Sequence, residues 1–326
     1  MAPIGLSYFE HSQDFDSTGS SIYNGDDSST STSIYGEITY GLDDSLWVTL
    51  GGRVMRDEQT RNFSMRYQGS QLNESLDDGT TVTLPKLVLQ YAITDNTTLA
   101  ASARRGYNAG GGALSLAESE YYYYDEEFVD TFELSSRSEF LDGNVNLSAN
   151  LFYNNFDGYQ ASNQARKITN VDKAVTYGIE TALTAMLGNN WQLTTGVGLL
   201  DSEIKRADPN YGDVIGNQLN AAPHVTANLG IKYWLNDELT FGLSGNYVGE
   251  YFADINNTED RVAGDYVVTR FSVDYQANSW RVSGFVNNLF DEQALTVNEP
   301  PSRSYVDGYA AIIDPRNIGV SVMYNF

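Results

Sequence analysis

The sequence of 326 residues predicts an all-β fold, a transmembrane antiparallel up-and-down β-barrel of about fourteen strands. Three observations predict this fold. Apolar residues alternate with polar ones in short runs, short and long connections alternate between the runs, and the composition is rich in Tyr (23) and Phe (14) but poor in Pro (7). Tyr and Phe favour strands and membrane interfaces. We expect residues 1–326 to form one barrel domain.

The clearest alternation lies at the C-terminus. From Ile318 to Phe326 every second residue is apolar, and the residues between are small or polar apart from Met323. Side chains of a strand point to opposite faces with a period of two, whereas a helix would distribute the same residues around its circumference. The pattern therefore predicts a final strand with one apolar face.

At the N-terminus, Ile4–Glu10 is predicted as a short strand and Ser12–Ser33 as a polar loop. Six hairpins are then expected, each with a tight turn that contains Asp, Asn or both. The predicted strand pairs are 34–40 with 46–54, 87–91 with 99–104, 132–140 with 145–154, 175–183 with 191–199, 225–233 with 239–247, and 267–275 with 280–288.

Long connections separate these hairpins. Outer-membrane barrels have short periplasmic turns and long extracellular loops, and a soluble sandwich has no reason to alternate short and long connections in this way. The alternation therefore favours a barrel over a sandwich. The expected long loops are 57–79, 107–127, 157–173, 201–220, 250–264 and 291–316.

The same alternation assigns faces to the strands. In one strand Val225, Leu229 and Ile231 alternate with Thr226, Asn228 and Lys232. We expect the apolar set to face lipid and the polar set to face the lumen of the barrel.

Composition excludes several classes of protein. The net charge of −24 with only 19 Lys and Arg argues against a nucleic-acid partner, which would require a basic surface. No window approaches the roughly 18 apolar residues of a membrane-spanning helix. Cys is absent, so there is no disulfide or thiolate site. The first residues lack the basic and apolar regions of a signal peptide.

Several motifs resemble TonB-dependent outer-membrane receptors. Ser33–Arg53 resembles a receptor hairpin that ends in Gly-x-Arg, and Gly106-Tyr-Asn-Ala-Gly-Gly111 resembles a strand-to-loop exit of the family. Other matches are Phe132-Glu-Leu134, Gly178-Ile-Glu180, Asn217–Pro223 and the terminal Tyr-Asn-Phe326.

The resemblance implies uptake of a scarce, bulky nutrient across the Gram-negative outer membrane, most simply a ferric siderophore. The implied partners are outer-membrane lipid, a small-molecule or glycan substrate, and the energy-coupling protein TonB. The family's receptors have a signal, a TonB box, a plug and twenty-two strands. This chain is expected to supply part of such a barrel, so TonB would act through a plug that is absent from it. Glycan uptake and a passive fourteen-strand channel remain alternatives.

Two groups of residues are candidates for substrate binding. Tyr121, Tyr122, Tyr123 and Tyr124, followed by acidic residues 125–127, could stack on a sugar or an aromatic chelate. They could equally form a strand extension above the membrane. Arg104, Arg105 and Tyr107 could meet an anionic ligand near the outer end of a strand, or Arg104 could form an ion pair in the lumen wall.

No catalytic, metal or cofactor site is expected. His11 and His224 are isolated and lack metal-ligand spacing, and no serine lies in a nucleophile-elbow pattern. We therefore predict that the chain is not an enzyme and needs no cofactor.

Overall fold

The computed structural model of the chain describes residues 3–18, 22–67, 70–115, 120–162, 168–207, 211–299, 301 and 307–325. Within these ranges fourteen strands form one continuous antiparallel sheet. This confirms the predicted fold class and strand number. The strands are β1 (Ile4–Thr18), β2 (Ile22–Gly41), β3 (Leu46–Tyr67), β4 (Ser70–Thr94), β5 (Thr97–Asn108), β8 (Glu127–Phe140), β9 (Val145–Ser162), β10 (Ile168–Leu187), β11 (Trp191–Arg206), β12 (Val225–Trp234), β13 (Leu239–Val248), β16 (Tyr266–Ala277), β17 (Trp280–Asn287) and β20 (Asn317–Tyr324).

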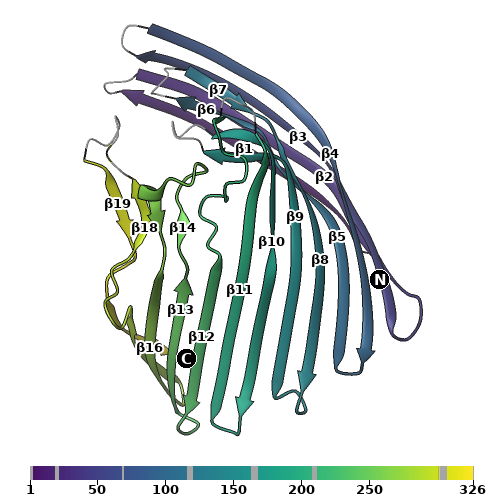
Figure 1. Cartoon of the computed structure of the whole chain (residues 1–326), viewed down its shortest axis with the longest axis vertical. Helices are drawn as coiled ribbons and strands as arrows, with labels where there is room; N and C mark the ends of the chain where they lie inside the picture. Colours follow the sequence, from purple (N-terminus) through teal and green to yellow (C-terminus); the bar gives the residue numbers. More distant parts are fainter. Residues whose placement is uncertain are drawn as a thin grey trace.

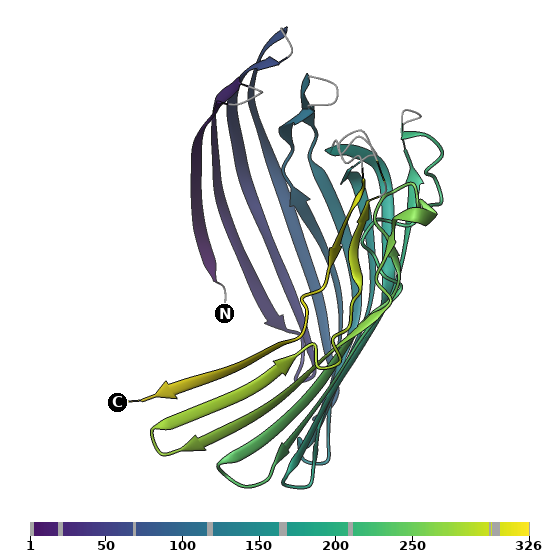
Figure 2. The same ribbon diagram turned by 90° about the vertical axis from the view of Figure 1, so that its left-hand side faces the viewer.

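The sheet curves into an open trough, and its strands fan out, with β2–β4 running obliquely to β10–β13 (Figure 1). Its two edges are β1, which pairs with β2, and β20, which pairs with β17. In the described part of the chain no ladder joins β1 to β20, and the two strands lie apart (Figure 2). The fourteen strands are therefore a barrel wall that does not close on itself.

The register of the sheet lines up apolar residues in rows across the strands. One row crosses six strands, and the row one residue further along each strand is polar or small. A register slip of one residue would exchange the two faces of a strand, so the observed register determines which side chains share a face, as the sequence predicted. The apolar row is Leu193, Ile231, Leu243, Phe271, Val286 and Ile318, and the neighbouring row is Thr194, Gly230, Ser244, Arg270, Asn287 and Asn317.

The polar rows face the concave side of the trough. A hollow in the sheet is lined by Ser135, Asn150, Glu180 and Thr226, which belong to one such row. Side chains of the apolar rows are accessible on the convex side, and Val320, for example, is 71% exposed. This placement agrees with an apolar face turned to lipid and a polar face turned to the lumen.

Aromatic residues gather near the tight turns, at the lower end of the sheet in Figure 1. The rings of Trp191 and Tyr233 have centroids 4.4 Å apart, and those of Trp280 and Tyr324 are 4.7 Å apart. Both are directly paired across neighbouring strands. Aromatic pairs of this kind form the girdles at the interfaces of membrane barrels.

The predicted loop at Ser12–Ser33 is wrong, because β1 and β2 continue as a regular ladder up to the pair Thr18 and Ile22. The predicted loop at 57–79 is wrong for the same reason, since β3 and β4 remain paired as far as Tyr67 and Ser70. The apolar alternation disappears there, but the backbone hydrogen bonds do not depend on side-chain polarity. We call this part of β1–β4 (residues 10–18, 22–30, 56–67 and 70–81) the extension.

Other predicted loops also contain strands. β9 and β10 reach Ser162 and Ile168, and β11 reaches Arg206, so the loops predicted at 157–173 and 201–220 are shorter than expected. Three small hairpins and one 3-10 turn complete the described structure. They are β6 (Gly111–Ser115) with β7 (Glu120–Tyr124), β14 (Tyr251–Phe252) with β15 (Val262–Ala263), β18 (Leu295–Glu299) with β19 (Tyr309–Ile312), and η2 (Glu259–Arg261).

A small apolar core lies at the upper end of β10 and β11. Ile204, Val171 and Val214 have no exposed surface, and Ile255 is 1% exposed. Loop residues from 211–224 and 249–264 thus pack on the strands and are fixed by hydrogen bonds such as Asn217 Nδ2 to the Ile255 carbonyl, 3.0 Å. Among the described residues no helix is long and apolar enough to span a membrane.

Candidate ligand-binding surface at the rim

The extension begins where the apolar rows of the convex face end. Leu6, Ile34 and Val54 form the last apolar row of β1–β3, and two rows further Glu10, Thr30 and Glu58 take their place. Apolar side chains are stable against lipid and charged ones against water. A bilayer that covers the apolar band would therefore end between these rows, with the extension above this membrane boundary.

The concave side of the extension carries aromatic rings. Phe15 and Phe63 lie in one row on either side of Gly25, with ring centroids 6.2 Å apart. A Cβ at Gly25 would lie 2.6 Å from Phe15 Cζ, so glycine is needed for the ring to cross this position. Tyr23 adds a ring whose centroid is 6.3 Å from both phenylalanines.

The β6–β7 hairpin adds two further rings to this set. Tyr121 stacks on Phe63 with 4.8 Å between centroids, and Tyr123 meets Tyr121 edge to face at 5.5 Å. Phe63 is 6% exposed, whereas Tyr123 is 41% exposed. We call the five rings, Phe15, Tyr23, Phe63, Tyr121 and Tyr123, the aromatic surface.

Side chains of β3 attach the hairpin to the extension. Gln59 Nε2 donates to the Gly110 carbonyl at 3.0 Å, and Arg61 Nη1 donates to the Gly112 carbonyl at 2.8 Å. On the other side of β7, the Tyr122 hydroxyl accepts a hydrogen bond from the Ile168 amide of β10, 2.8 Å. The four tyrosines thus point to both sides of β7, as predicted, and only one side contributes to the aromatic surface.

A small pocket opens beside Tyr123, between the extension, β5 and the hairpin. Its volume is about 120 Å³. Side chains lining it include four carboxylates, Asp57, Asp78, Asp125 and Glu126, together with Gln59, Tyr107, Tyr123 and Tyr124. We call it the rim pocket.

Tyr107 lies in an environment that disfavours negative charge on its ring. Burial raises the pKa of the Tyr107 hydroxyl, and the nearby carboxylates of Asp57, Glu126 and Asp78 raise it further. The hydroxyl therefore stays protonated and forms a hydrogen bond with Asp57. Its ring also contacts Phe128, with 5.5 Å between centroids.

The two predicted arginines lie outside the rim pocket. Arg104 Nη2 is 3.2 Å from Glu133 Oε1, which is the lumen-wall ion pair considered from the sequence. Arg105 lies on the opposite face of β5, where its guanidinium forms two hydrogen bonds with Asp130, of 2.8 and 2.7 Å. The structure brings Tyr107, Tyr123 and Tyr124 together but separates them from both arginines.

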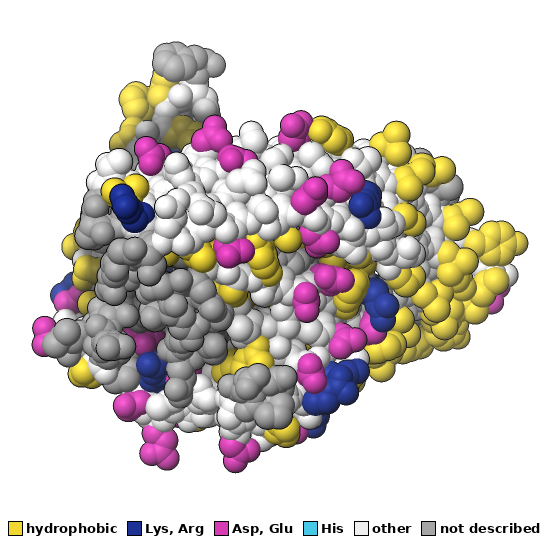
Figure 3. Space-filling model, turned by 90° about the horizontal axis from the view of Figure 1, so that it is seen from above, with side chains coloured by type: hydrophobic (Ala, Val, Ile, Leu, Met, Phe, Trp, Pro, Cys, Tyr) yellow, Lys and Arg dark blue, Asp and Glu magenta, His cyan; other side chains and the backbone are white. Residues whose placement is uncertain are grey.

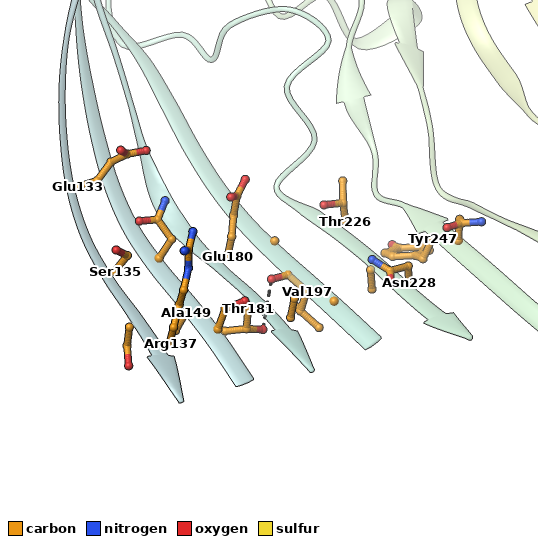
Figure 4. A pocket seen from close by; sticks show the side chains of 18 of the residues that line it. Glu133, Ser135, Arg137, Ala149, Glu180, Thr181, Val197, Thr226, Asn228 and Tyr247 are labelled. Atoms are coloured by element: carbon orange, nitrogen blue, oxygen red, sulfur yellow. Dashed lines mark hydrogen bonds between the residues drawn. The ribbon is translucent and has the colours of Figure 1, made fainter. Parts of the chain in front are cut away.

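A larger hollow lies lower on the concave wall, with a volume of about 710 Å³ (Figure 4). Glu133 and Arg137 of β8, Glu180 of β10 and Asn228 of β12 project toward it. The lining combines charged side chains of both signs with amide and hydroxyl groups, as expected of the polar face of the sheet. Among four charged residues of the concave rows, Glu180, Arg270, Asp274 and Arg281, the described part of the chain shows one ion pair, between Arg281 and Asp274 at 4.0 Å.

Sequence reasoning missed six contributors to the rim: Phe15, Tyr23, Phe63, Asp57, Gln59 and Asp78. All six lie within or at the start of segments predicted as loops. A weak signal was available, because large residues at 59, 61, 63 and 65 alternate with small polar ones at 60, 62 and 64. That is strand alternation with the larger side chains on the concave side.

The sheet has an apolar convex face, aromatic residues near its tight turns and a polar hollow on its concave face. Together these features are typical of an outer-membrane β-barrel. The protein-family model described as TonB dependent receptor-like, beta-barrel, matches residues 2–289. The chain therefore belongs to the TonB-dependent receptor β-barrel family, whose members are outer-membrane transporters of Gram-negative bacteria and not enzymes.

Named relatives share this architecture. The chain is 27% identical over 240 residues to the probable TonB-dependent siderophore receptor PiuA of Acinetobacter baumannii, a match that covers 68% of this chain and 30% of that protein. The ferric yersiniabactin uptake receptor FyuA of Yersinia pestis has a TM-score of 0.82 at 20% identity, covering 94% of this chain and 47% of that one. The crystal structure of PiuA from Acinetobacter baumannii has a TM-score of 0.75 at 21% identity, covering 92% of this chain and 44% of that one. The chain thus spans less than half the length of these relatives.

Proposed function

We propose that the protein takes up a ferric complex of an organic chelator across the Gram-negative outer membrane, with this chain forming part of the barrel wall. The observation that carries the proposal is the family match over residues 2–289. Support comes from the names of the relatives, which are siderophore and ferric-complex receptors. Energy would come from TonB, through a plug domain of the kind that complete receptors contain.

The aromatic surface supplies a structural reason for this choice. Planar rings stack on the flat groups that many iron chelators use, and such contacts contribute about 0.5–1.5 kcal/mol per pair beyond burial. Tyr123 is the accessible end of the surface, and it lies on the concave side above the membrane boundary. A ligand arriving from outside would meet it before entering the barrel.

Iron uptake by cells tests the proposal. A strain whose only receptor for ferric chelates is the natural protein containing this chain should accumulate radioactive iron from at least one complex. Accumulation should stop when TonB is deleted, and Tyr123→Ala should reduce it at least fivefold at limiting concentration. Absence of uptake from hydroxamate, catecholate, carboxylate and mixed phenolate complexes would contradict the proposal.

Glycan uptake by the same family remains the second candidate, because aromatic rings beside carboxylates also bind sugar rings. Growth on oligosaccharides in the same strain, without iron uptake, would favour it. A passive channel closed by these fourteen strands is not supported, since β1 and β20 do not pair in the described part of the chain.

A further inference from the structure

Two residues that line the rim pocket, Asp57 and Gln59, each have a side-chain oxygen that lacks a hydrogen-bond donor. Asp57 Oδ1 and Gln59 Oε1 are both buried, and neither has a hydrogen-bond partner among the described residues. Gln59 is held in this orientation because its Nε2 donates to the Gly110 carbonyl. A buried acceptor without a donor costs about 1–3 kcal/mol. The pocket is therefore suited to a ligand group that brings donors.

The charge of the pocket selects a cationic donor. Its lining has four carboxylates and no Lys, Arg or His. Burial is the main cause of the raised pKa of Tyr107, and three of these carboxylates raise it further, in agreement with a negative potential in the pocket. Seen from above, Asp and Glu side chains are scattered over much of the molecule, with fewer Lys and Arg among them (Figure 3). A cation would thus be attracted to this end of the protein and held most strongly in the pocket.

The geometry favours an organic cation over a metal ion. In the described ranges no three His, Asp or Glu side chains converge closely enough to hold a metal. The carboxylates instead surround a space of about 120 Å³, which admits an ammonium group and its neighbouring methylene but not an entire iron complex. An ammonium has three donors, enough for Asp57, Gln59 and one further carboxylate.

The aromatic surface adjoins the pocket through Tyr123, which belongs to both. A ring attached to the ammonium by a short arm could therefore stack on Tyr123 or Tyr121 while the arm enters the pocket. Cations close to tyrosine faces gain further attraction.

From these observations we propose that the rim pocket binds a protonated amine carried on an aromatic ligand. This inference deepens the proposed function and rests on it, because it assigns a cationic arm to the complex that is taken up. It also explains how an acidic rim could select against chelates that carry only negative charge.

Two small probes test the pocket directly: 4-fluorobenzylamine, which is protonated at pH 7, and 4-fluorobenzyl alcohol, which is neutral. Binding is measured by fluorine NMR on the natural protein in a nonionic detergent, with empty micelles as the blank. We expect a Kd at least tenfold lower for the amine. The Asp57→Asn and Asp78→Asn variants should each reduce this preference to less than threefold.

Asp26→Asn is the matched control. Asp26 lies on the convex side of the extension, where it accepts a hydrogen bond from Asn62. The substitution therefore removes the same negative charge as the two test variants without changing the lining of the rim pocket. Equal affinity for the two probes in the native protein would overturn the proposal. So would an equal loss of preference in Asp26→Asn, since that would indicate attraction by net charge alone.

Asp26→Asn also provides the check on folding. It keeps every carboxylate of the rim pocket, so the amine preference should persist in this variant. The iron-uptake assay separates the two hypotheses. Uptake without amine preference would remove only the pocket assignment, and amine preference without uptake of any ferric complex would remove only the transport proposal.

Discussion

The ring of Phe63 in β3 stacks on the ring of Tyr121 in β7, with centroids 4.8 Å apart and planes inclined by 23°. This contact joins the β6–β7 hairpin to the extension. It also places Tyr123 at the edge of the rim pocket, since Tyr121 and Tyr123 share one face of β7. The proposed ligand-binding surface therefore depends on Phe63, which is itself almost inaccessible to solvent.

Phe63→Ala should release the hairpin. Removing a buried phenyl ring lowers the free energy of unfolding by about 3–5 kcal/mol in a well-packed core. We expect a smaller loss of about 1–3 kcal/mol here, because Phe63 packs at the rim of the sheet and not in a closed core. Hydrogen exchange of the amides in 111–113 and 121–124 should accelerate at least tenfold. Phe9→Ala is the control, because Phe9 lies on the same face but is 58% exposed. Unchanged exchange in Phe63→Ala would show that Gln59 and Arg61 alone hold the hairpin.

Leu243→Arg should impair assembly in a membrane by about 2–4 kcal/mol, because Leu243 lies in the middle of an apolar convex row. Ser272→Arg is matched in depth, since Ser272 pairs with Gly242, and it lies on the concave face. It should be tolerated. Urea titrations of folding into lipid vesicles measure both variants. Equal penalties would mean that the assigned faces are wrong.

Arg104→Gln should change stability by less than about 1 kcal/mol. Its ion pair with Glu133 is half exposed, with 53% of the arginine side chain accessible, and such pairs contribute little. Iron uptake should be unchanged if the ion pair only lines the lumen. A large loss of uptake with normal folding would instead return Arg104 to the list of ligand-binding residues.

The raised pKa of Tyr107 should make the free energy of unfolding decrease at alkaline pH. A tyrosine in the unfolded chain ionises near pH 10, whereas the raised pKa keeps Tyr107 protonated in the native state. Above pH 10 the native state therefore holds more protons than the unfolded state, and the free energy of unfolding decreases by up to about 1.4 kcal/mol per pH unit. Unfolding measured from pH 9 to 11.5 should show a shallower decrease in Tyr107→Phe. Parallel curves would contradict this assignment.

The edges of the sheet make a further prediction. β1 has fifteen residues with one unpaired side, and unsatisfied backbone groups are costly in lipid. The 326-residue chain produced alone should aggregate or insert poorly, and it should show no steady conductance in planar bilayers. The same segment within the complete natural protein should fold. Stable single-channel currents from the isolated chain would show that β1 and β20 can join.

Sequence predicted the membrane part of the wall well. Every second residue around Ile231 and Leu243 is apolar because one face meets lipid and the other water, so the strand pattern is visible. The tight turns were equally clear, since Asn236 accepts hydrogen bonds from the amides of Glu238 and Leu239, as expected of a turn asparagine.

The extension escaped prediction because most side chains on both of its faces are polar, and its few apolar ones, such as Phe63, are buried on the concave side. Ser28 and Thr60 face one way and Ser29 and Gln59 the other, so no apolar alternation marks the strands. The rim pocket was hidden for a different reason. Asp57 and Asp78 are brought together by the β3–β4 ladder in a segment predicted as a loop, and Glu126 comes from the connection between β7 and β8.

The extension also determines what an external macromolecule encounters. From Arg56 to Tyr67, β3 continues past the boundary row for about 40 Å of contour at about 3.3 Å per residue. Its convex side presents hydroxyl, amide and carboxylate groups on a hydrogen-bonded ladder, and a flat, rigid patch of that kind makes a good antibody epitope. Immunoglobulins raised against folded protein should therefore recognise β1–β4 on intact cells, whereas the aromatic rings behind them would stay out of reach.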